Sequence, residues 1–160
     1  MTNTLRRASI ALVAMLLVSC ATSTQTSAPV SGRAPISDLL GVRLGMPRDT
    51  VRSSLAGTAS LEREERRRHE VWTLTGDPRY ASLIIGYSPD WKVRFVTAVA
   101  KPDGVAVRYD EVLDTATADH RAAGNTHTWT WSTGTPRYYV IAIGPPDRLE
   151  YLSIKEQPEG

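Results

Sequence analysis

Three runs between residues 71 and 100 alternate apolar and polar positions as half-buried β-strands do. The runs are Val71–Thr75, Ala81–Tyr87 and Val93–Ala100. Turn-forming residues separate them at 76–78 and 88–90. In the third run every second residue, from Val93 to Val99, falls on one face by strict alternation. The pattern predicts a three-stranded antiparallel meander.

The segment before these runs, Ile36–Gly57, has a helical period instead. Val51 and Leu55 share one face at i, i+4. Pro47 suits a first helical position, where its missing N–H costs nothing, and Gly57 is a typical C-terminal stop. We therefore expect two short helical pieces in this segment.

The second half of the chain repeats this order of elements. A stripe at i, i+3, i+4 and i+7 predicts a helix that ends at Gly124; its members are Tyr109, Val112, Leu113 and Ala116. Three strand-like runs follow, and they are His127–Ser132, Tyr138–Ile143 and Leu149–Ile154.

The two halves also share short motifs. Trp-Thr begins at Trp72 and again at Trp129, and Pro-Arg-Tyr ends at Tyr80 and again at Tyr138. The repeat distance is about 58 residues, longer than in most solenoids. A tandem pair of related units accounts for this; chance similarity between two hairpins is the alternative that the sequence leaves open.

These elements predict an α+β fold of two tandem units, each a helix followed by a three-stranded antiparallel meander. The helices are expected to pack on one face of the sheet. The first unit covers residues 36–101, and the second, packed with the first, covers 102–160. Whether the halves form one sheet or two is left open.

Residues 1–19 are typical of a targeting segment. Arg6 and Arg7 precede the apolar stretch Ala8–Val18, which as a helix covers only about 16 Å, roughly half of a bilayer core. The tetrapeptide Leu17-Val18-Ser19-Cys20 resembles the bacterial lipobox, in which signal peptidase cuts before the cysteine and the thiol is lipidated. An ordinary secretory signal with a chance cysteine is the alternative.

Cys20 is the only cysteine, so no internal disulfide is expected and the anchor is its chemistry. The lipobox resemblance implies a diacylglycerol plus an N-acyl (palmitate) chain, enough for stable membrane anchoring. Ala21, in place of Asp, favours the outer membrane by the same resemblance. Residues 20–35 are rich in Ser, Thr, Ala and Pro and predict a lipid-anchored flexible linker.

The net charge of the chain serves only to exclude one class of function, nucleic-acid binding. The formal net charge is +2, from 19 basic and 17 acidic residues. Without the two arginines of residues 1–19, 17 basic residues remain against 17 acidic, and this neutral balance argues against nucleic-acid binding. The dense charge run Glu62–Glu70 cancels locally and predicts a solvated loop or frayed helix end; a docking loop for a charged partner is the alternative.

The sequence holds no nucleophile elbow, phosphate-binding glycine loop or His-Glu-x-x-His helix. Its three histidines, His69, His120 and His127, are expected to be solvated or capping, although spacing alone leaves a metal or acid–base role open. We therefore expect no catalytic residue, no metal and no cofactor.

Aromatic side chains are the candidates for partner binding, because they bury much area at low entropy cost. Trp72, Trp129 and Trp131 are expected mainly in the core, whereas Trp91 beside a turn is as readily exposed. Adjacent Tyr138 and Tyr139 must point to opposite faces of their strand. The partner-binding candidates are Trp91, Trp129, Trp131, Tyr138 and Tyr139.

The run Gly41–Leu55, followed by Val71-Trp-Thr-Leu and by the strand Leu83-Ile-Ile-Gly-Tyr, resembles the SmpA/OmlA (BamE-like) bacterial lipoprotein domain. That domain belongs to the broader β-lactamase-inhibitor-protein-like group. The likeness covers residues 36–101. It implies a lipid-anchored protein on the periplasmic side of the outer membrane, with another envelope protein as partner.

From these features we expect a non-enzymatic protein-binding or scaffolding module, in outer-membrane assembly or maintenance. The alternative, from the other branch of the resemblance, is an inhibitor of a periplasmic or extracellular enzyme. A hydrolase with an unrecognised site is the third hypothesis.

Overall fold

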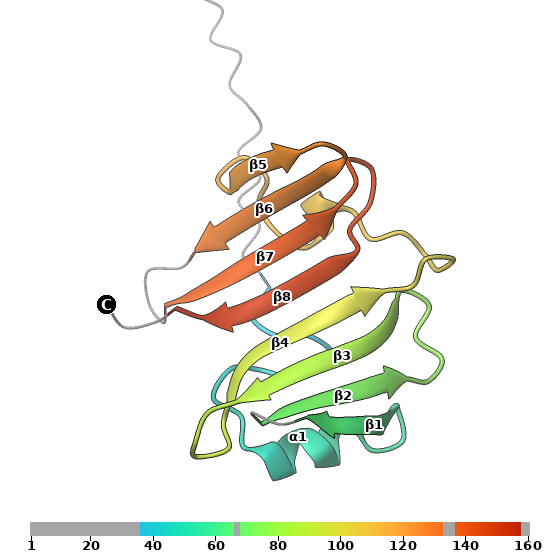
Figure 1. Cartoon of the computed structure of the whole chain (residues 1–160), viewed down its shortest axis with the longest axis vertical. Helices are drawn as coiled ribbons and strands as arrows, with labels where there is room; N and C mark the ends of the chain where they lie inside the picture. The colour runs from blue at the N-terminus through green and yellow to red at the C-terminus, as the bar shows by residue number, and fades with distance from the viewer. Residues whose placement is uncertain (1–35, 66–67, 133–136, 158–160) are drawn as a thin grey trace, which may run out of the picture.

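The computed structural model describes residues 36–65, 68–132 and 137–157 (Figure 1). Eight strands form one antiparallel sheet in the order β1-β2-β3-β4-β8-β7-β6-β5. The strands are β1 (Ala59–Glu65), β2 (His69–Leu74), β3 (Tyr80–Tyr87), β4 (Val93–Ala100), β5 (Asp119–Ala123), β6 (Thr126–Ser132), β7 (Tyr138–Gly144) and β8 (Tyr151–Glu156). The helical elements are α1 (Arg48–Leu55) and a 3₁₀ turn, η1 (Tyr109–Glu111).

Each half of the chain is thus a four-stranded meander, and the last strands of the two meanders, β4 and β8, pair antiparallel at the centre. The prediction of two units, each with a helix and three strands and with the helices packed on one face, was wrong. The described residues contain a single α-helix, and each meander has one strand more than expected. The question of one sheet or two is answered by the β4–β8 pairing, which makes the sheet continuous.

The helix α1 confirms the first helical prediction. Pro47 is its N-cap residue, in extended conformation and one position before the first helical position expected, and Val51 and Leu55 form the buried face of the helix. Gly57 follows with φ of 87°, a left-handed conformation that glycine adopts without strain. The second helical piece expected before Pro47 was wrong: residues 36–47 form turns and an isolated bridge between Leu39 and Val42.

The described residues of the charge run Glu62–Glu70 belong mostly to two paired strands instead of a loop or helix end. Its first part belongs to β1, whose side chains are exposed after Ala59, and its last residues begin β2. β1 is an edge strand, and charged side chains on an edge hinder pairing with other chains. The high charge density therefore marks an edge strand here.

The helix expected from Tyr109 to Gly124 was also wrong, and Asp114 gives the physical reason. Its carboxylate Oδ1 accepts a hydrogen bond from the Ala116 amide at 3.0 Å, an Asx turn that competes with helical hydrogen bonding. Only η1 is helical in this region. Gly124 lies in the two-residue turn between β5 and β6, with φ of 61°.

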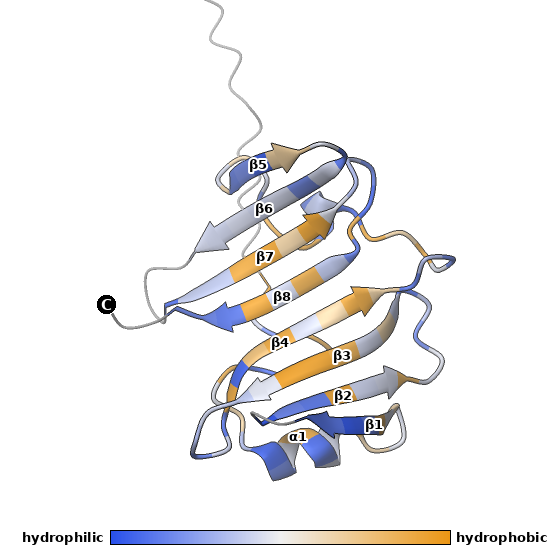
Figure 2. Cartoon of the chain, viewed as in Figure 1, coloured by the Kyte–Doolittle hydropathy of each residue, from blue (hydrophilic) through white to orange (hydrophobic). Residues whose placement is uncertain are grey.

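One face of the sheet, the covered face, carries the hydrophobic core. Its rows run in register across strands from both halves, and one row contains Trp72, Leu83, Ala98, Leu152, Ala142 and Trp129. The helix α1 and the segments 36–47 and 101–118 lie over this face, and their apolar residues join one continuous core cluster. The central strands β3, β4, β7 and β8 hold most of the apolar sheet residues, as Figure 2 shows.

The opposite face, the open face, is turned toward the viewer in Figure 1. Neither α1 nor the segments named above cover it. In the described part of the chain, α1 has eight residues, and no helix there is long and apolar enough to cross a membrane.

Candidate functional site

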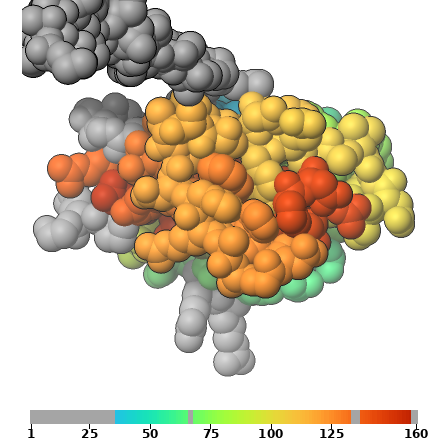
Figure 3. All heavy atoms as spheres, turned by 90° about the horizontal axis from the view of Figure 1, so that it is seen from above, coloured from blue at the N-terminus to red at the C-terminus, as the bar shows by residue number. Residues whose placement is uncertain are grey.

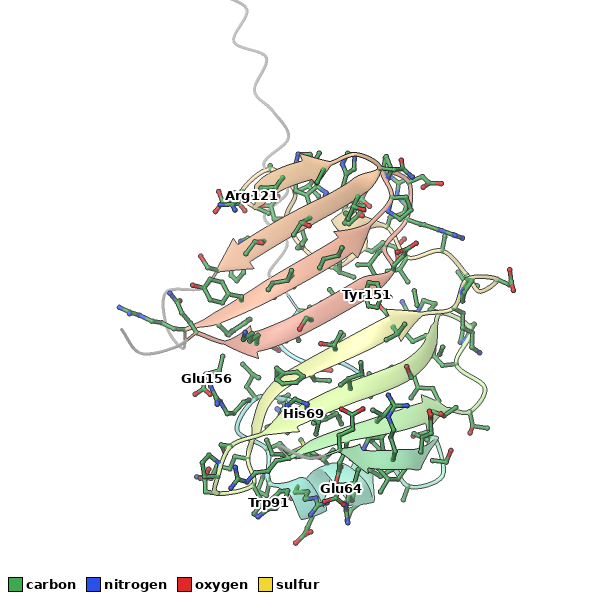
Figure 4. All side chains as sticks on the ribbon, in the orientation of Figure 1. Glu64, His69, Trp91, Arg121, Tyr151 and Glu156 are labelled. Atoms are coloured by element: carbon green, nitrogen blue, oxygen red, sulfur yellow. The ribbon has the colours of Figure 1, made fainter. Side chains whose placement is uncertain are left out.

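The open face combines apolar, aromatic and hydroxyl side chains at its centre. Strand register places Phe95, Lys155 and Tyr139 in one row and Val99, Tyr151 and Ile143 in another. Between these rows the Thr97 hydroxyl donates a hydrogen bond to the Ser153 hydroxyl at 2.9 Å, across the β4–β8 joint. Tyr151 is 45% exposed, and Figure 4 shows it on the same face as His69.

A pocket of about 460 Å³ opens at one end of this face. It is lined by Arg68, His69, Gly86, Tyr87, Pro89, Arg94, Phe95, Lys155 and Glu156. Because β4 and β8 pair, this pocket joins residues from both halves of the chain.

Gly86 and Phe95 form the apolar part of the pocket. A Cβ atom at position 86 would lie 2.0 Å from Phe95 Cε1, so only glycine lets the aromatic ring lie across the β3 backbone. The His69 ring meets Phe95 edge-on, with centroids 5.2 Å apart and planes at 77°. These contacts fix the orientation of both rings, because an edge-to-face arrangement is the preferred geometry for such pairs.

The charged rim of the pocket is predominantly basic. Arg68, Arg94 and Lys155 supply three cations and Glu156 one anion. The Arg94 Nε to Glu156 Oε2 distance is 3.5 Å, and both side chains are about half exposed, so this ion pair is weak and open to exchange. The rim can therefore accept an acidic group from another molecule.

On the covered face, directly behind the pocket, Glu70 ties α1 to the sheet. It is 1% exposed, and its Oε1 accepts hydrogen bonds from Arg48 Nε at 2.6 Å and from Arg52 Nη2 at 2.6 Å. Its Oε2 accepts hydrogen bonds from Trp72 Nε1 at 3.0 Å and from the Tyr87 hydroxyl at 2.8 Å. Every acceptor of this buried carboxylate is thus engaged by a neighbour on α1, β2 or β3.

The same contacts set the titration of the cluster. Burial raises the pKa of Glu70, but the hydrogen bonds from Arg48, Arg52, Tyr87 and Trp72 outweigh it and hold the pKa below its usual value. Burial, together with the hydrogen bond to Glu70, raises the pKa of Tyr87. Glu70 is therefore ionised and Tyr87 protonated at neutral pH.

The lowered pKa of Glu70 predicts loss of stability in acid. A carboxylate with a depressed folded-state pKa contributes stability above its unfolded value, about 4.3, and this is lost as pH falls through the folded-state pKa. We expect urea midpoints to fall steeply below about pH 4. In Glu70→Gln the urea midpoint at neutral pH should be lower than in the wild type. The part of the fall in acid that comes from Glu70 should be absent. An unchanged acid slope in Glu70→Gln would contradict the assignment.

Trp91 lies beside this cluster, at the N-terminal end of α1. Its φ is 60°, and its carbonyl accepts a hydrogen bond from the Arg48 amide at 3.0 Å. The Arg48 guanidinium lies over the indole ring of Trp91, 4.4 Å from its centroid. Trp91 itself remains 38% exposed. Trp91 thus holds the start of α1 against the turn before β4.

The structure separates the other predicted partner-binding aromatics. Trp129, Trp131 and Tyr138 are partly buried and pack against the core on the covered face. Tyr139 lies on the open face, in the row of Phe95 and Lys155. The candidate residues therefore form no common surface. Cys20, with the expected signal segment 1–19 and the whole linker 20–35, lies outside the described residues.

Several pocket residues were missed by the sequence analysis. His69 was expected to be solvated, and Phe95 was grouped with Val93 on one face. A bulge at Arg94 shifts the β3–β4 register, so that Tyr87 pairs with Val93 and Gly86 with Phe95. Val93 therefore joins the core while Phe95 lies on the open face. The alternation of apolar and polar residues predicted the strand correctly. Nothing in the local sequence indicates the bulge, which places Val93 and Phe95 on opposite faces.

Two histidines that are seven residues apart in sequence meet in space. His120 Nε2 and His127 Nδ1 are 3.0 Å apart on the β5–β6 hairpin, at the opposite end of the sheet from α1. Within the described ranges, no three or more His, Cys, Asp or Glu side chains converge so as to hold a metal ion.

No protein-family model, curated protein or solved structure matches this chain. The resemblance to the SmpA/OmlA domain stays a prediction from the motif.

Proposed function

We propose that this chain is a lipid-anchored envelope protein that binds, without catalysis, an acidic segment of a partner protein on its open sheet face. The observation that carries the proposal is the pocket, with its Phe95 and His69 rings and its rim of three cations and one anion. Such a site complements a segment in which an apolar side chain stands beside Asp or Glu.

The chemistry around the pocket favours binding. Its lining offers aromatic and guanidinium groups, the side chains most enriched in protein interfaces. Among the residues that the structure describes, this lining contains no serine, threonine or cysteine nucleophile beside His69. The adjoining rows, with Tyr139 and Tyr151, extend the same face beyond the pocket and give a partner segment room to lie along it.

The expected anchor fits this role. A lipidated Cys20 with a flexible linker to residue 35 would hold the domain on average about 20 Å from the membrane surface. A partner on the same membrane is then met at high effective concentration, so a modest intrinsic affinity suffices.

The proposal is tested by site-specific crosslinking in intact cells. A photoreactive amino acid at Tyr139, on the open face, should crosslink one partner, and mass spectrometry should place the adduct in an acidic segment. At Leu40, which is 37% exposed on the covered side, it should not yield that adduct. The double change Arg94→Glu and Lys155→Glu should reduce the adduct by about tenfold or more. Arg43→Glu, at an exposed arginine that does not line the pocket, should leave it unchanged.

Two results would count against the proposal. One is an adduct that forms equally well after charge reversal at the pocket. The other is capture of the same soluble enzyme by the wild type and by Cys20→Ala, with loss of that enzyme's activity, which favours the inhibitor hypothesis. Loss of the adduct in Cys20→Ala agrees with a partner met at the membrane.

A further inference from the structure

The β5–β6 hairpin carries a pair of histidines that takes no part in the proposed binding site on the open face. His120 on β5 and His127 on β6 bring Nε2 and Nδ1 within 3.0 Å of each other. In Figure 3 the orange spheres of this hairpin face the viewer, with the yellow segment 101–118 beside them. His120 is exposed and His127 is half-buried, so both can be reached from solution.

The backbone fixes this pair. Ala123 and Thr126 close a two-residue turn in which Gly124 takes a positive φ of 61°, typical of a type II′ hairpin. In the resulting register His120 is opposite Trp129 and Ala122 opposite His127, so the two histidines are diagonal neighbours on one face. Tight hairpins hold such neighbours at short distance.

The His120 ring is also oriented by stacking. It lies on the Trp129 indole with centroids 4.2 Å apart and planes at 26°. Trp129 in turn lies 6.1 Å from Tyr109, centroid to centroid, and packs against the core. This support limits the entropy that His120 would lose on binding a ligand.

The nitrogen–nitrogen distance matches a metal chelate. Imidazole nitrogens lie roughly 2.0–2.1 Å from a bound ion, so two of them at 90° are about 2.9 Å apart and at the tetrahedral angle about 3.3 Å apart. The observed 3.0 Å lies near the first value. A 90° angle is that of neighbouring ligands in the tetragonal geometry of Cu²⁺, which also binds nitrogen ligands most tightly among the divalent first-row ions.

We propose that His120 and His127 form a two-histidine site for Cu²⁺, with the remaining coordination positions taken by water or by groups of other molecules. Nε2 of His120 and Nδ1 of His127 are the ligand atoms. The proton that one of them carries in the metal-free contact shifts to the outer nitrogen of the same ring, so each ring binds as a neutral imidazole.

The test uses Trp129 as a built-in reporter. The full chain, purified in detergent and carrying Cys20→Ser to remove its thiol, is titrated with Cu²⁺ while tryptophan emission and binding heat are followed. We expect saturable 1:1 binding. Because the chain has four tryptophans, the emission should fall by at least the contribution of one of them. Trp129→Phe should lose most of the quenching and keep the 1:1 heat, which localises the ion.

Matched variants decide the ligands. His120→Gln and His127→Gln should each abolish the saturable phase, while His69→Gln, at the far end of the sheet, should keep it. Circular dichroism confirms that each variant is folded. Zn²⁺, measured in the same way, should bind about tenfold or more weakly than Cu²⁺. Equal quenching in all three histidine variants, dependence on only one of the pair, or tighter binding of Zn²⁺ than Cu²⁺ would overturn the proposal.

Discussion

Replacing Glu70 by alanine should lower the free energy of unfolding by about 3–5 kcal/mol, measured by urea denaturation at pH 7. The substitution leaves hydrogen-bond donors in the interior without the acceptor that Glu70 provides. Arg48 and Arg52 converge on the Glu70 carboxylate, and the Arg48 side chain is only 18% exposed. Without Glu70 the two guanidinium groups keep only the half-exposed Glu64 as an ion-pair partner, and the Trp72 indole N–H and the Tyr87 hydroxyl lose their acceptor. Burying unpaired donors costs more than the intact contact contributes.

The variant Glu62→Ala is the control for this prediction. Glu62 lies in the same charge run, and its side chain is 50% exposed in an ion pair with Arg63. Exposed pairs of this kind contribute little, so we expect a change below about 1 kcal/mol. Glu70→Gln keeps the volume and removes only the charge, and it should recover a minor part of the loss. Similar small effects of both alanine variants would show that Glu70 does not hold α1 on the sheet.

Glu70 also shows where sequence reasoning reaches and where it stops. A run with four acids and four arginines predicts solvent exposure, and for Glu62, Glu64 and Glu65 this is what the structure has. Glu70 differs because it shares strand parity with Trp72 and Leu74, which places it on the covered face. The parity is visible in the sequence. The two arginines that neutralise it come from α1, at a distance that no local pattern encodes.

Strand prediction succeeded where the two-residue period was combined with apolar and β-branched residues. The runs that became β2, β3, β4, β6, β7 and β8 were all expected. β1 and β5 were missed because both are polar edge strands, with almost all side chains exposed. Edge strands gain their stability from a neighbour's hydrogen bonds more than from burial, so their hydrophobic signal is weak.

The helix expected from Tyr109 to Gly124 was predicted wrongly because its apolar spacing has another cause. The spacing of Tyr109, Val112 and Leu113 does bury these residues, but as anchors of an irregular segment that covers the second half of the sheet. The stripe predicted a helix, which did not form, and its fourth member, Ala116, is exposed. The Asx turn at Asp114 decided between the two, since its side chain replaces the next helical hydrogen bond.

The pocket on the open face could be foreseen least. Its residues come from four strands and from the turns at Arg68 and Pro89. Phe95 and Lys155 meet only because β4 pairs with β8. A repeat of about 58 residues predicts two similar units, but it does not state which strands join them. Long-range pairing, rather than local pattern, therefore placed the proposed binding site.

The β4–β8 joint leads to the second large prediction. Leu152→Ala should lower the free energy of unfolding by about 3–5 kcal/mol, because Leu152 is fully buried in the row that crosses both halves of the sheet. Its neighbours across the strands, Ala98 on β4 and Ala142 on β7, are also fully buried and too small to fill the cavity. We expect the loss in urea denaturation followed by tryptophan emission.

The matched control is Leu61→Ala, the same chemical change at a side chain that is 39% exposed on the edge strand β1; it should cost less than about 1 kcal/mol. Because one core cluster spans both halves, in each variant that keeps only Trp72 or only Trp129 the tryptophan emission and the circular dichroism should report the same unfolding midpoint. Leu152→Ala should then lower the midpoint of both variants by a similar amount. Two separate transitions, with only the Trp129 signal shifted, would mean that the meanders fold independently and that the β4–β8 joint adds no shared stability.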